Sequence, residues 1–174
     1  MRKMIFIGGI HGVGKTSLCE DLTTRYEIPH FSASKLIATE KEEAYSRNKL
    51  IPDINQNQDL LSNSLNRINI SGWFLLDGHF CLLNTSSEIT RIPIDTFEKI
   101  SPASIIVLTD LTSSIQKRFF QRDGHQFDFN LLENFQNAEI EYAREISSSL
   151  KIPILVAQSG NTESIHEFIN RTIQ

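Results

Sequence analysis

Residues 8–17 combine four glycines with a lysine and a threonine, in the order Gly-Gly-Ile-His-Gly-Val-Gly-Lys-Thr-Ser. The pattern G-x-x-x-x-G-K-[ST], whose loop holds phosphate groups with backbone N–H groups, is matched by Gly9, Gly14, Lys15 and Thr16. Glycine permits the positive φ angles and the close approach that such a loop needs. A helix that begins where the loop ends directs its unpaired N–H groups and partial positive charge at the same anion. These residues therefore predict a phosphate-binding loop.

Two side chains of this loop add charge and a metal ligand. Lys15 supplies a mobile positive charge for the β- and γ-phosphates of a nucleoside triphosphate, and the Thr16 hydroxyl can bind Mg²⁺. His11 is expected to act through its backbone N–H more than through its ring. We expect ATP and Mg²⁺ as cofactors, and the residues expected to contact them are Gly9, His11, Gly12, Val13, Gly14, Lys15, Thr16 and Ser17.

A second acidic ligand for Mg²⁺ is expected at Asp77. This residue follows the continuous apolar run 73–76, which is typical of a strand buried on both faces. A carboxylate at the end of such a strand can hold Mg²⁺ through water, together with Thr16. The alternative is an aspartate that caps a helix or stabilises a turn. His79, two residues later, is a candidate contact for the second substrate.

Arg118 and Arg122 are four residues apart on a predicted helix, so their side chains share one face. Two arginines at the mouth of a nucleotide site could clamp a phosphoryl group during its transfer and stabilise its charge. The alternative is an exposed basic face without a function. Together with Lys15 and Asp77, these arginines are our candidate catalytic residues.

Strands and helices are predicted to alternate along the chain. Apolar runs predict strands near residues 3–8, 28–31, 73–76, 105–109 and 152–156. Helical spacing of apolar residues predicts helices near 14–26, 32–45, 53–70, 95–100, 115–122, 130–150 and from Thr162, which is expected to cap the last one. Residues 84–93 are predicted to be a loop. This alternation predicts an α/β fold with a parallel sheet, helices on both faces and ligands beyond the carboxyl ends of the strands.

Composition narrows the class of protein. The 174 residues carry a net charge of −4, so we expect no nucleic-acid partner, and no apolar run approaches the about 18 residues of a membrane span. The two cysteines, Cys19 and Cys81, give neither a disulfide framework nor metal-ligand spacing; Cys19 is expected in a helix core. His30, His125 and His166 are expected to be surface or packing residues. We expect small nucleotides as partners and a cytoplasmic location.

The chain resembles the P-loop nucleoside-monophosphate kinases, most closely the archaeal-type adenylate kinases. The phosphate loop, the segment Leu75–His79 and the segment 116–123 carry this resemblance over nearly the whole length. It implies a single domain, 1–174, with a three-layer P-loop NTPase fold and a five-stranded parallel sheet in the order 2-3-1-4-5. It also implies acceptor-binding helices at about 32–70, begun by Ser32 and Ser34, which would contact substrate, and a short lid at about 118–130.

The residues expected to bind the phosphoryl acceptor differ from the pattern of the adenylate kinases. No arginine lies between Ser32 and Arg47, and His79-Phe80 stands where classical adenylate kinases have Pro-Arg. The family's arginine beyond the lid has no clear counterpart, since the nearby positions are Ala138 and Glu139, with Arg144 further on. The sequence predicts a Mg-ATP-dependent phosphotransferase for a nucleoside monophosphate or related small nucleotide. The alternatives are a kinase for a hydroxyl substrate and a nucleotide-dependent switch, which alone would imply a protein partner.

Overall fold

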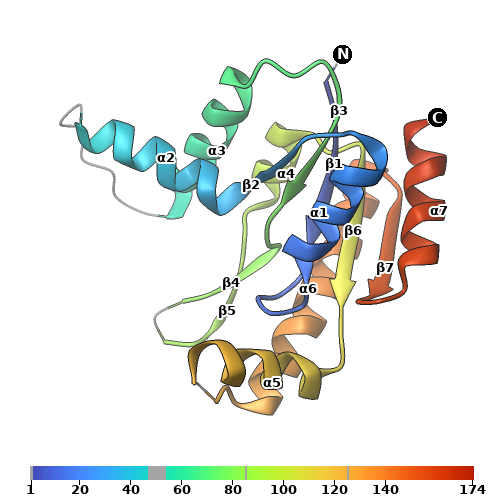
Figure 1. Cartoon of the computed structure of the whole chain (residues 1–174). Helices are drawn as coiled ribbons and strands as arrows, with labels where there is room; N and C mark the ends of the chain where they lie inside the picture. The colour runs from blue at the N-terminus through green and yellow to red at the C-terminus, as the bar shows by residue number, and fades with distance from the viewer. Residues whose placement is uncertain (1, 47–53, 85, 125) are drawn as a thin grey trace.

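The fold is built on one parallel sheet, described here from a computed structural model that covers residues 2–46, 54–84, 86–124 and 126–174 (Figure 1). Parts of the expected acceptor-binding helices and lid, including His125, lie outside these described residues. The strands of the sheet are β1 (Arg2–Gly8), β2 (His30–Ser32), β3 (Gly72–Asp77), β6 (Ser104–Thr109) and β7 (Ile154–Gln158). Their order is β2-β3-β1-β6-β7, so the sheet strands, counted along the chain, follow the predicted 2-3-1-4-5.

The central strands are apolar because the sheet is covered on both sides. Residues 4–7 of β1 and 105–107 of β6 are at most 2% exposed. Such continuous apolar runs are the pattern expected of parallel strands between two helical layers. The register of β1 places Ile7 beside Asp77 of β3 and Gly8 beside Val107 of β6. The phosphate loop after β1 therefore begins between the ends of both neighbouring strands.

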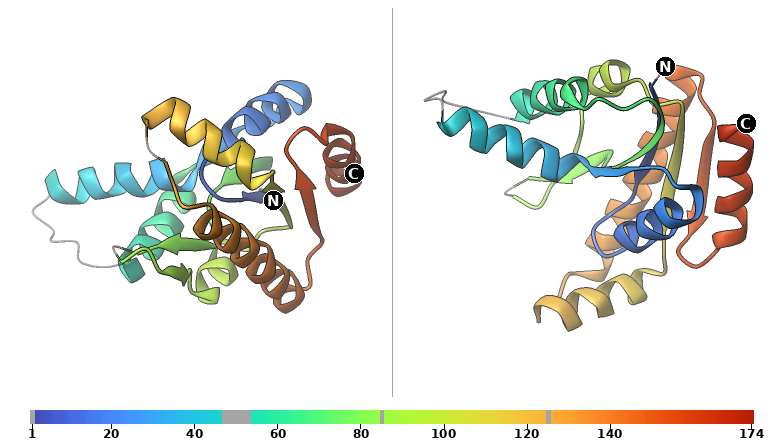
Figure 2. Two further views of the ribbon diagram at one scale, coloured as in Figure 1. Left: turned by 90° about the horizontal axis from the view of Figure 1, so that it is seen from below. Right: turned by 45° about the horizontal axis from the view of Figure 1, so that its top comes forward.

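Helices form the other two layers. Figure 2 shows α1 (Lys15–Tyr26) and α7 (Thr162–Ile173) on one face of the sheet, with α4 (Ile94–Ile100) and α6 (Phe129–Leu150) on the other. The Tyr26 hydroxyl lies 3.2 Å from Nδ1 of His166 and joins α1 to α7. Helix α5 (Thr112–Asp123) lies beyond the carboxyl ends of the strands. Within the described part of the chain, no helix is long and apolar enough to cross a membrane.

Two further helices, α2 (Ala33–Ser46) and α3 (Ile54–Arg67), project as a pair beyond the β2 edge of the sheet (Figure 1). An ion pair of 2.9 Å between Arg67 and Glu40 joins them. A second pair, Lys99 with Asp59 at 2.8 Å, joins α3 to α4. Helices α2 and α3 thus form one wall beside the sheet, and α2 begins directly after β2.

Two sequence predictions were wrong in detail. Residues 84–93, expected to be a loop, contain the second strand of an antiparallel hairpin made by β4 (Cys81–Leu83) and β5 (Ile89–Arg91). These strands have three residues each, which is too short for a period of two to show. The last helix is capped by the side chain of Asn161, which accepts a hydrogen bond from the Ser164 N–H, and not by Thr162.

Three phenylalanine rings pack against one another next to the start of the phosphate loop. The ring centroid of Phe6 lies 5.1 Å from that of Phe80 and 5.5 Å from that of Phe97, both edge-on. All three side chains are at most 2% exposed. A Cβ atom placed on Gly8 would lie 2.1 Å from Cε2 of Phe80. Glycine at position 8 therefore lets the hairpin pack directly under the loop.

We predict that Gly8→Ala destabilises the protein by about 1–3 kcal/mol, because the added methyl group overpacks the ring of Phe80. Urea unfolding of the wild type, Gly8→Ala, Phe80→Leu and the double variant measures this cost. The cost of Gly8→Ala should be smaller on the Phe80→Leu background, where the edge of the ring is gone. Equal costs on both backgrounds would show that Phe80 does not impose the glycine.

Candidate active site

A cleft of about 740 Å³ opens at the carboxyl ends of β1, β2 and β3. The structure brings most of the predicted site residues to its walls: His11, Gly12, Gly14, Lys15, Thr16, Ser17, Ser32, Ser34, Asp77, His79, Arg118 and Arg122. Gly9 and Val13 do not line the cleft; the side chain of Val13 is fully buried behind the loop. Residues expected to bind a nucleotide and residues expected to bind an acceptor thus share one space.

The phosphate loop has the backbone that its glycines predict. Gly9, Gly12 and Gly14 have φ angles of 144°, 79° and 105°. A Cβ atom at Gly9 would lie 2.5 Å from the carbonyl oxygen of Leu108, so β6 leaves no room for a side chain there. Gly14 is the N-cap of α1 in the left-handed conformation and carries no side chain that could cap the helix. The N-terminus of α1 therefore has no side-chain cap, which is the arrangement of a helix that can bind an anion.

The ammonium group of Lys15 folds back over the loop. Its Nζ donates hydrogen bonds to the carbonyl oxygens of Gly9 at 2.6 Å and Ile10 at 3.2 Å. Burial lowers the pKa of Lys15, while the nearby carboxylates of Glu139 and Asp77 raise it. The residue is 9% exposed. A phosphate in the loop would replace weak carbonyl partners with a charged one, which is a stronger hydrogen bond for an ammonium group.

Thr16 and Asp77 face the same cleft, as a shared Mg²⁺ requires. Asp77 also has a partner that the sequence did not predict. Nε2 of His30 lies 2.5 Å from its Oδ2 atom, and His30 lines the cleft, although this histidine was expected only to be a surface or packing residue. No local sequence pattern signals this pair, because the two residues are 47 positions apart.

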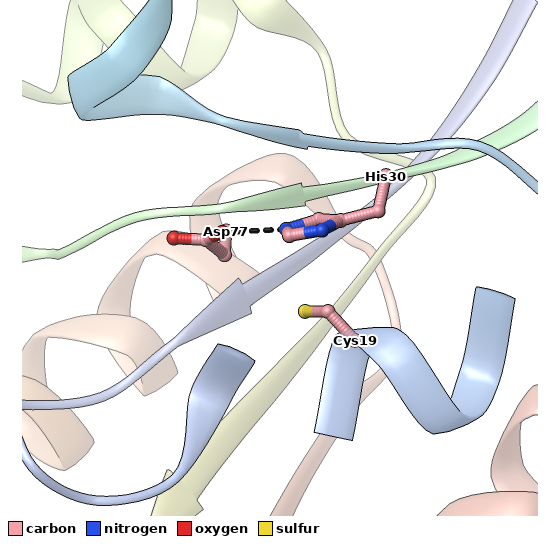
Figure 3. A group of neighbouring side chains, drawn as sticks. All are labelled: Cys19, His30 and Asp77. Atoms are coloured by element: carbon pink, nitrogen blue, oxygen red, sulfur yellow. Dashed lines mark hydrogen bonds and ion pairs between the residues drawn. The ribbon is translucent and has the colours of Figure 1, made fainter. Parts of the chain in front are cut away.

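Cys19 approaches the same pair from α1 (Figure 3). The ligand atoms of Cys19, His30 and Asp77 all lie within 4.8 Å of one another. Burial raises the pKa of the Cys19 thiol to about 12, and the field of Asp77 adds to this effect. The absence of metal-ligand spacing in the sequence was misleading, since these groups come from three separate elements.

His79 is fixed by a buried carboxylate. Nδ1 of His79 lies 3.2 Å from Oε1 of Glu139, and Oε2 of Glu139 accepts a hydrogen bond of 2.9 Å from the Phe80 N–H. Glu139 belongs to α6 and is fully buried. Two positions at which the chain departs from the adenylate kinase pattern therefore contact each other. Glu139 thus holds both His79 and the backbone of Phe80 in place.

Arg118 is attached to the phosphate loop. Its guanidinium donates hydrogen bonds of 2.9 Å to the Gly12 carbonyl and 2.5 Å to Oδ2 of Asp110. Asp110 follows β6 and is itself held by Gln136, which bonds both its N–H and its carbonyl. The guanidinium of Arg122 lies 5.2 Å from the centre of the Phe119 ring, at the rim of the cleft. Both arginines therefore line the same cleft as the phosphate loop.

The wall opposite the loop is mostly apolar. Its side chains come from α2, α3, the hairpin region and α4: Ala33, Ile37, Leu61, Leu82, Ile92, Phe97 and Ile100. Lys35 and Thr96 add polar groups to this wall. Lys35 was missed in the sequence because the resemblance called for an arginine there. Among the described residues that line the cleft, the cationic ones are Lys15, Lys35, Arg118 and Arg122.

The ring of His11 faces that of His79, with 4.4 Å between their centres. Part of His11 stays exposed, but its ring lies in the cleft beside several positive groups. Burial, followed by the positive charges of His79, Lys15 and Arg122, lowers the pKa of His11 to about 4. The ring is therefore neutral at pH 7 and adds no positive charge next to the phosphate loop.

We predict that the ring of His11 takes up its proton near pH 4 and not near the ordinary value of 6.5. Between these values the unfolded chain binds more protons, so stability falls as the pH drops. An NMR titration, with the His11 signals assigned from His11→Gln, measures the pKa. Urea unfolding at pH 7 and pH 5 should show a smaller loss for His11→Gln than for the wild type. A titration midpoint near pH 6.5 would show that burial and the neighbouring positive charges do not lower the pKa of His11.

Comparisons with known proteins identify the family to which the chain belongs. A model of the AAA domain family matches residues 8–136, which include the loop, Asp77 and both arginines. Human adenylate kinase isoenzyme 5 is 38% identical over 63 residues, and its mouse counterpart is 36% identical over 63 residues. That segment is 36% of this chain, and the match spans 11% of the length of those curated relatives.

Solved structures show the same fold. A gluconokinase from Sinorhizobium meliloti 1021 has a TM-score of 0.53 and 15% identity, over 98% of this chain and 89% of its own. An uncharacterized protein from Eubacterium ventriosum has a TM-score of 0.53 and 14% identity, over 98% of both chains. The predicted resemblance to P-loop kinases is confirmed at the level of fold and family. The chain belongs to the AAA domain family and shares the α/β fold of P-loop kinases.

Proposed function

We propose that this protein is a Mg-ATP-dependent phosphotransferase that acts on a nucleoside monophosphate or a related small nucleotide. One observation carries the proposal: the phosphate loop, Asp77 and the two arginines open onto the same cleft as an apolar wall. Such a shared space suits two substrates held close together, which is how phosphoryl transfer is accelerated. The kinases among the relatives support the same reaction class.

The residues of the loop fit a triphosphate with Mg²⁺. The left-handed glycines leave a cup of backbone, α1 begins without a side-chain cap, and the Thr16 hydroxyl is exposed to the cleft. In this proposal, Thr16 and Asp77 hold Mg²⁺, which neutralises charge on the phosphates when bound. Lys15 turns from the carbonyls of Gly9 and Ile10 to the phosphates. The internal hydrogen bonds of Lys15 are thus exchanged for hydrogen bonds to the phosphates.

Arg118 and Arg122 act in this proposal as the phosphate clamp. Arg118 already reaches the loop through Gly12, so a short movement brings its guanidinium onto a phosphate oxygen. The segment at about 118–130 would close over the site and exclude water, which would otherwise take the phosphoryl group. The single domain of residues 1–174, with acceptor-binding helices at about 32–70, belongs to the same proposal.

The apolar wall would receive the body of the acceptor. A nucleobase could lie among Ile37, Leu61 and Phe97, while Ser32, Ser34 and Lys35 face the acceptor's phosphate. Lys35 would then supply the charge that an arginine supplies in adenylate kinases. An acceptor phosphate is already an anion, so this reaction needs no general base.

A hydroxyl kinase is the second candidate, and the contact between His30 and Asp77 favours it. A hydroxyl acceptor requires a base, and Asp77, which contacts His30, would be the candidate. A regulatory ATPase without an acceptor is the third. Incubation with Mg-ATP and a panel of nucleosides, monophosphates and sugar acids, with detection of ADP and phosphorylated product, separates the three. Slow hydrolysis that no added acceptor accelerates would favour the regulatory ATPase.

We predict that Lys15→Ala abolishes phosphoryl transfer without unfolding the protein, because it removes the charge that binds the β- and γ-phosphates. Circular dichroism and thermal unfolding report the fold, and the panel assay reports transfer. Lys117→Ala, which changes an exposed lysine of α5, is the matched control and should keep wild-type activity. Turnover by a well-folded Lys15→Ala variant would count against the assignment.

We predict that Lys35→Ala raises the KM for a monophosphate acceptor by about 10- to 100-fold, since a hydrogen bond to a charged group contributes about 1.5–3 kcal/mol. The KM for ATP should change little. Lys41→Ala, on the same helix but outside the residues that line the cleft, is the control. An unchanged acceptor KM in Lys35→Ala, together with phosphorylation of a neutral hydroxyl compound, would favour the hydroxyl kinase.

A further inference from the structure

Three potential metal ligands converge beside the cleft (Figure 3). Cys19 comes from α1, His30 from β2 and Asp77 from β3. Their ligand atoms lie within 4.8 Å of one another. We propose that these three side chains form a binding site for Zn²⁺ or a similar borderline-soft divalent metal ion. The second part of this proposal rests on the proposed function: an ion bound at this site withdraws Asp77 from Mg²⁺ and so inhibits phosphoryl transfer.

The donor atoms distinguish this site from the one expected for Mg²⁺. A thiolate, an imidazole and a carboxylate are a typical ligand set for Zn²⁺. Mg²⁺ prefers six oxygen ligands and gains nothing from sulfur. Thr16 and Asp77 suit Mg²⁺, whereas Cys19 and His30 suit a softer ion. Asp77 is common to both sets, so the two ions would compete for it.

The distances are close to those of a metal site. With bonds of about 2.3 Å to sulfur and 2.0–2.2 Å to nitrogen and oxygen, tetrahedral ligands stand roughly 3.3–3.6 Å apart. The His30 and Asp77 atoms, now 2.5 Å apart, would separate, and the Cys19 sulfur would approach. Each change is of the order of 1 Å, which side-chain rotation supplies.

The surroundings favour a specific site over adventitious binding at the surface. Cys19 is fully buried, and the side chains of His30 and Asp77 are 20% and 15% exposed. Coordination of the metal would replace the thiol proton, which passes to the buffer. His30 and Asp77 both line the cleft. Three protein ligands therefore leave a fourth position that faces the cleft, open to water or to a phosphate oxygen.

Cobalt spectroscopy tests the site without reference to activity. Co²⁺ added to the metal-free protein should give a thiolate-to-cobalt charge-transfer band and the visible bands of tetrahedral coordination, saturating at one equivalent. Zn²⁺ should abolish both sets of bands. Cys19→Ser should lose the charge-transfer band, and His30→Gln should weaken Co²⁺ binding. Cys81→Ser, which alters the other buried thiol, should keep the wild-type spectrum.

The site is overturned if the wild type gives no thiolate band, or if the band survives in Cys19→Ser and disappears in Cys81→Ser. Matching circular dichroism and melting temperatures of the variants without metal exclude misfolding as the cause of a lost band. His30→Gln, on a half-buried edge strand, serves as the second variant should Cys19→Ser fail to fold.

Inhibition is tested separately. At fixed Mg-ATP, Zn²⁺ should reduce turnover of the wild type and of Cys81→Ser at least tenfold more effectively than turnover of Cys19→Ser, and added Mg²⁺ should relieve it. Equal inhibition of the wild type, Cys81→Ser and Cys19→Ser would overturn the inference that a metal ion at this site inhibits phosphoryl transfer. A protein without phosphotransferase activity that still shows the cobalt bands would refute the proposed function and leave the metal site in place.

Discussion

The buried ammonium group of Lys15 is the charge around which the cleft is arranged. Removing a cation from water is costly, and here the carbonyls of Gly9 and Ile10 and the fields of Glu139 and Asp77 offset that cost. Carbonyl groups are neutral, so a phosphate is a better partner for the same ammonium. The loop is thus held in shape by an internal contact that an anionic ligand can displace.

The strand order explains why the other groups meet at this charge. With β1 in the centre of the sheet, the loop emerges beside the ends of β3 and β6, and each neighbour delivers an acid: Asp77 on one side and Asp110 on the other. Asp77 lines the same cleft as Thr16, and Asp110 binds Arg118, which also contacts the loop at Gly12. A parallel sheet gathers its functional groups at the carboxyl ends of its strands, so residues from distant parts of the chain come together.

The loop and the long helices could be predicted from local sequence patterns, and the order of the sheet followed from the resemblance to P-loop kinases. The hairpin at 81–91, the contact of His30 with Asp77 and the approach of Cys19 could not, because they depend on which strands are neighbours. Lys35 was overlooked because a family pattern had directed the search to arginine. The contact between His79 and Glu139 could not be predicted either, because the two residues are 60 positions apart in the sequence.

The central claim is that a triphosphate displaces the loop's own carbonyls from Lys15. A crystal structure of the protein with Mg²⁺ and a non-hydrolysable ATP analogue tests it most directly. The account predicts the β- and γ-phosphates within hydrogen-bonding distance of the loop N–H groups and of Lys15 Nζ, which has left the Gly9 carbonyl, with Mg²⁺ between Thr16 and Asp77. A triphosphate bound outside the loop, or one bound while Lys15 still contacts the carbonyls of Gly9 and Ile10, would contradict it.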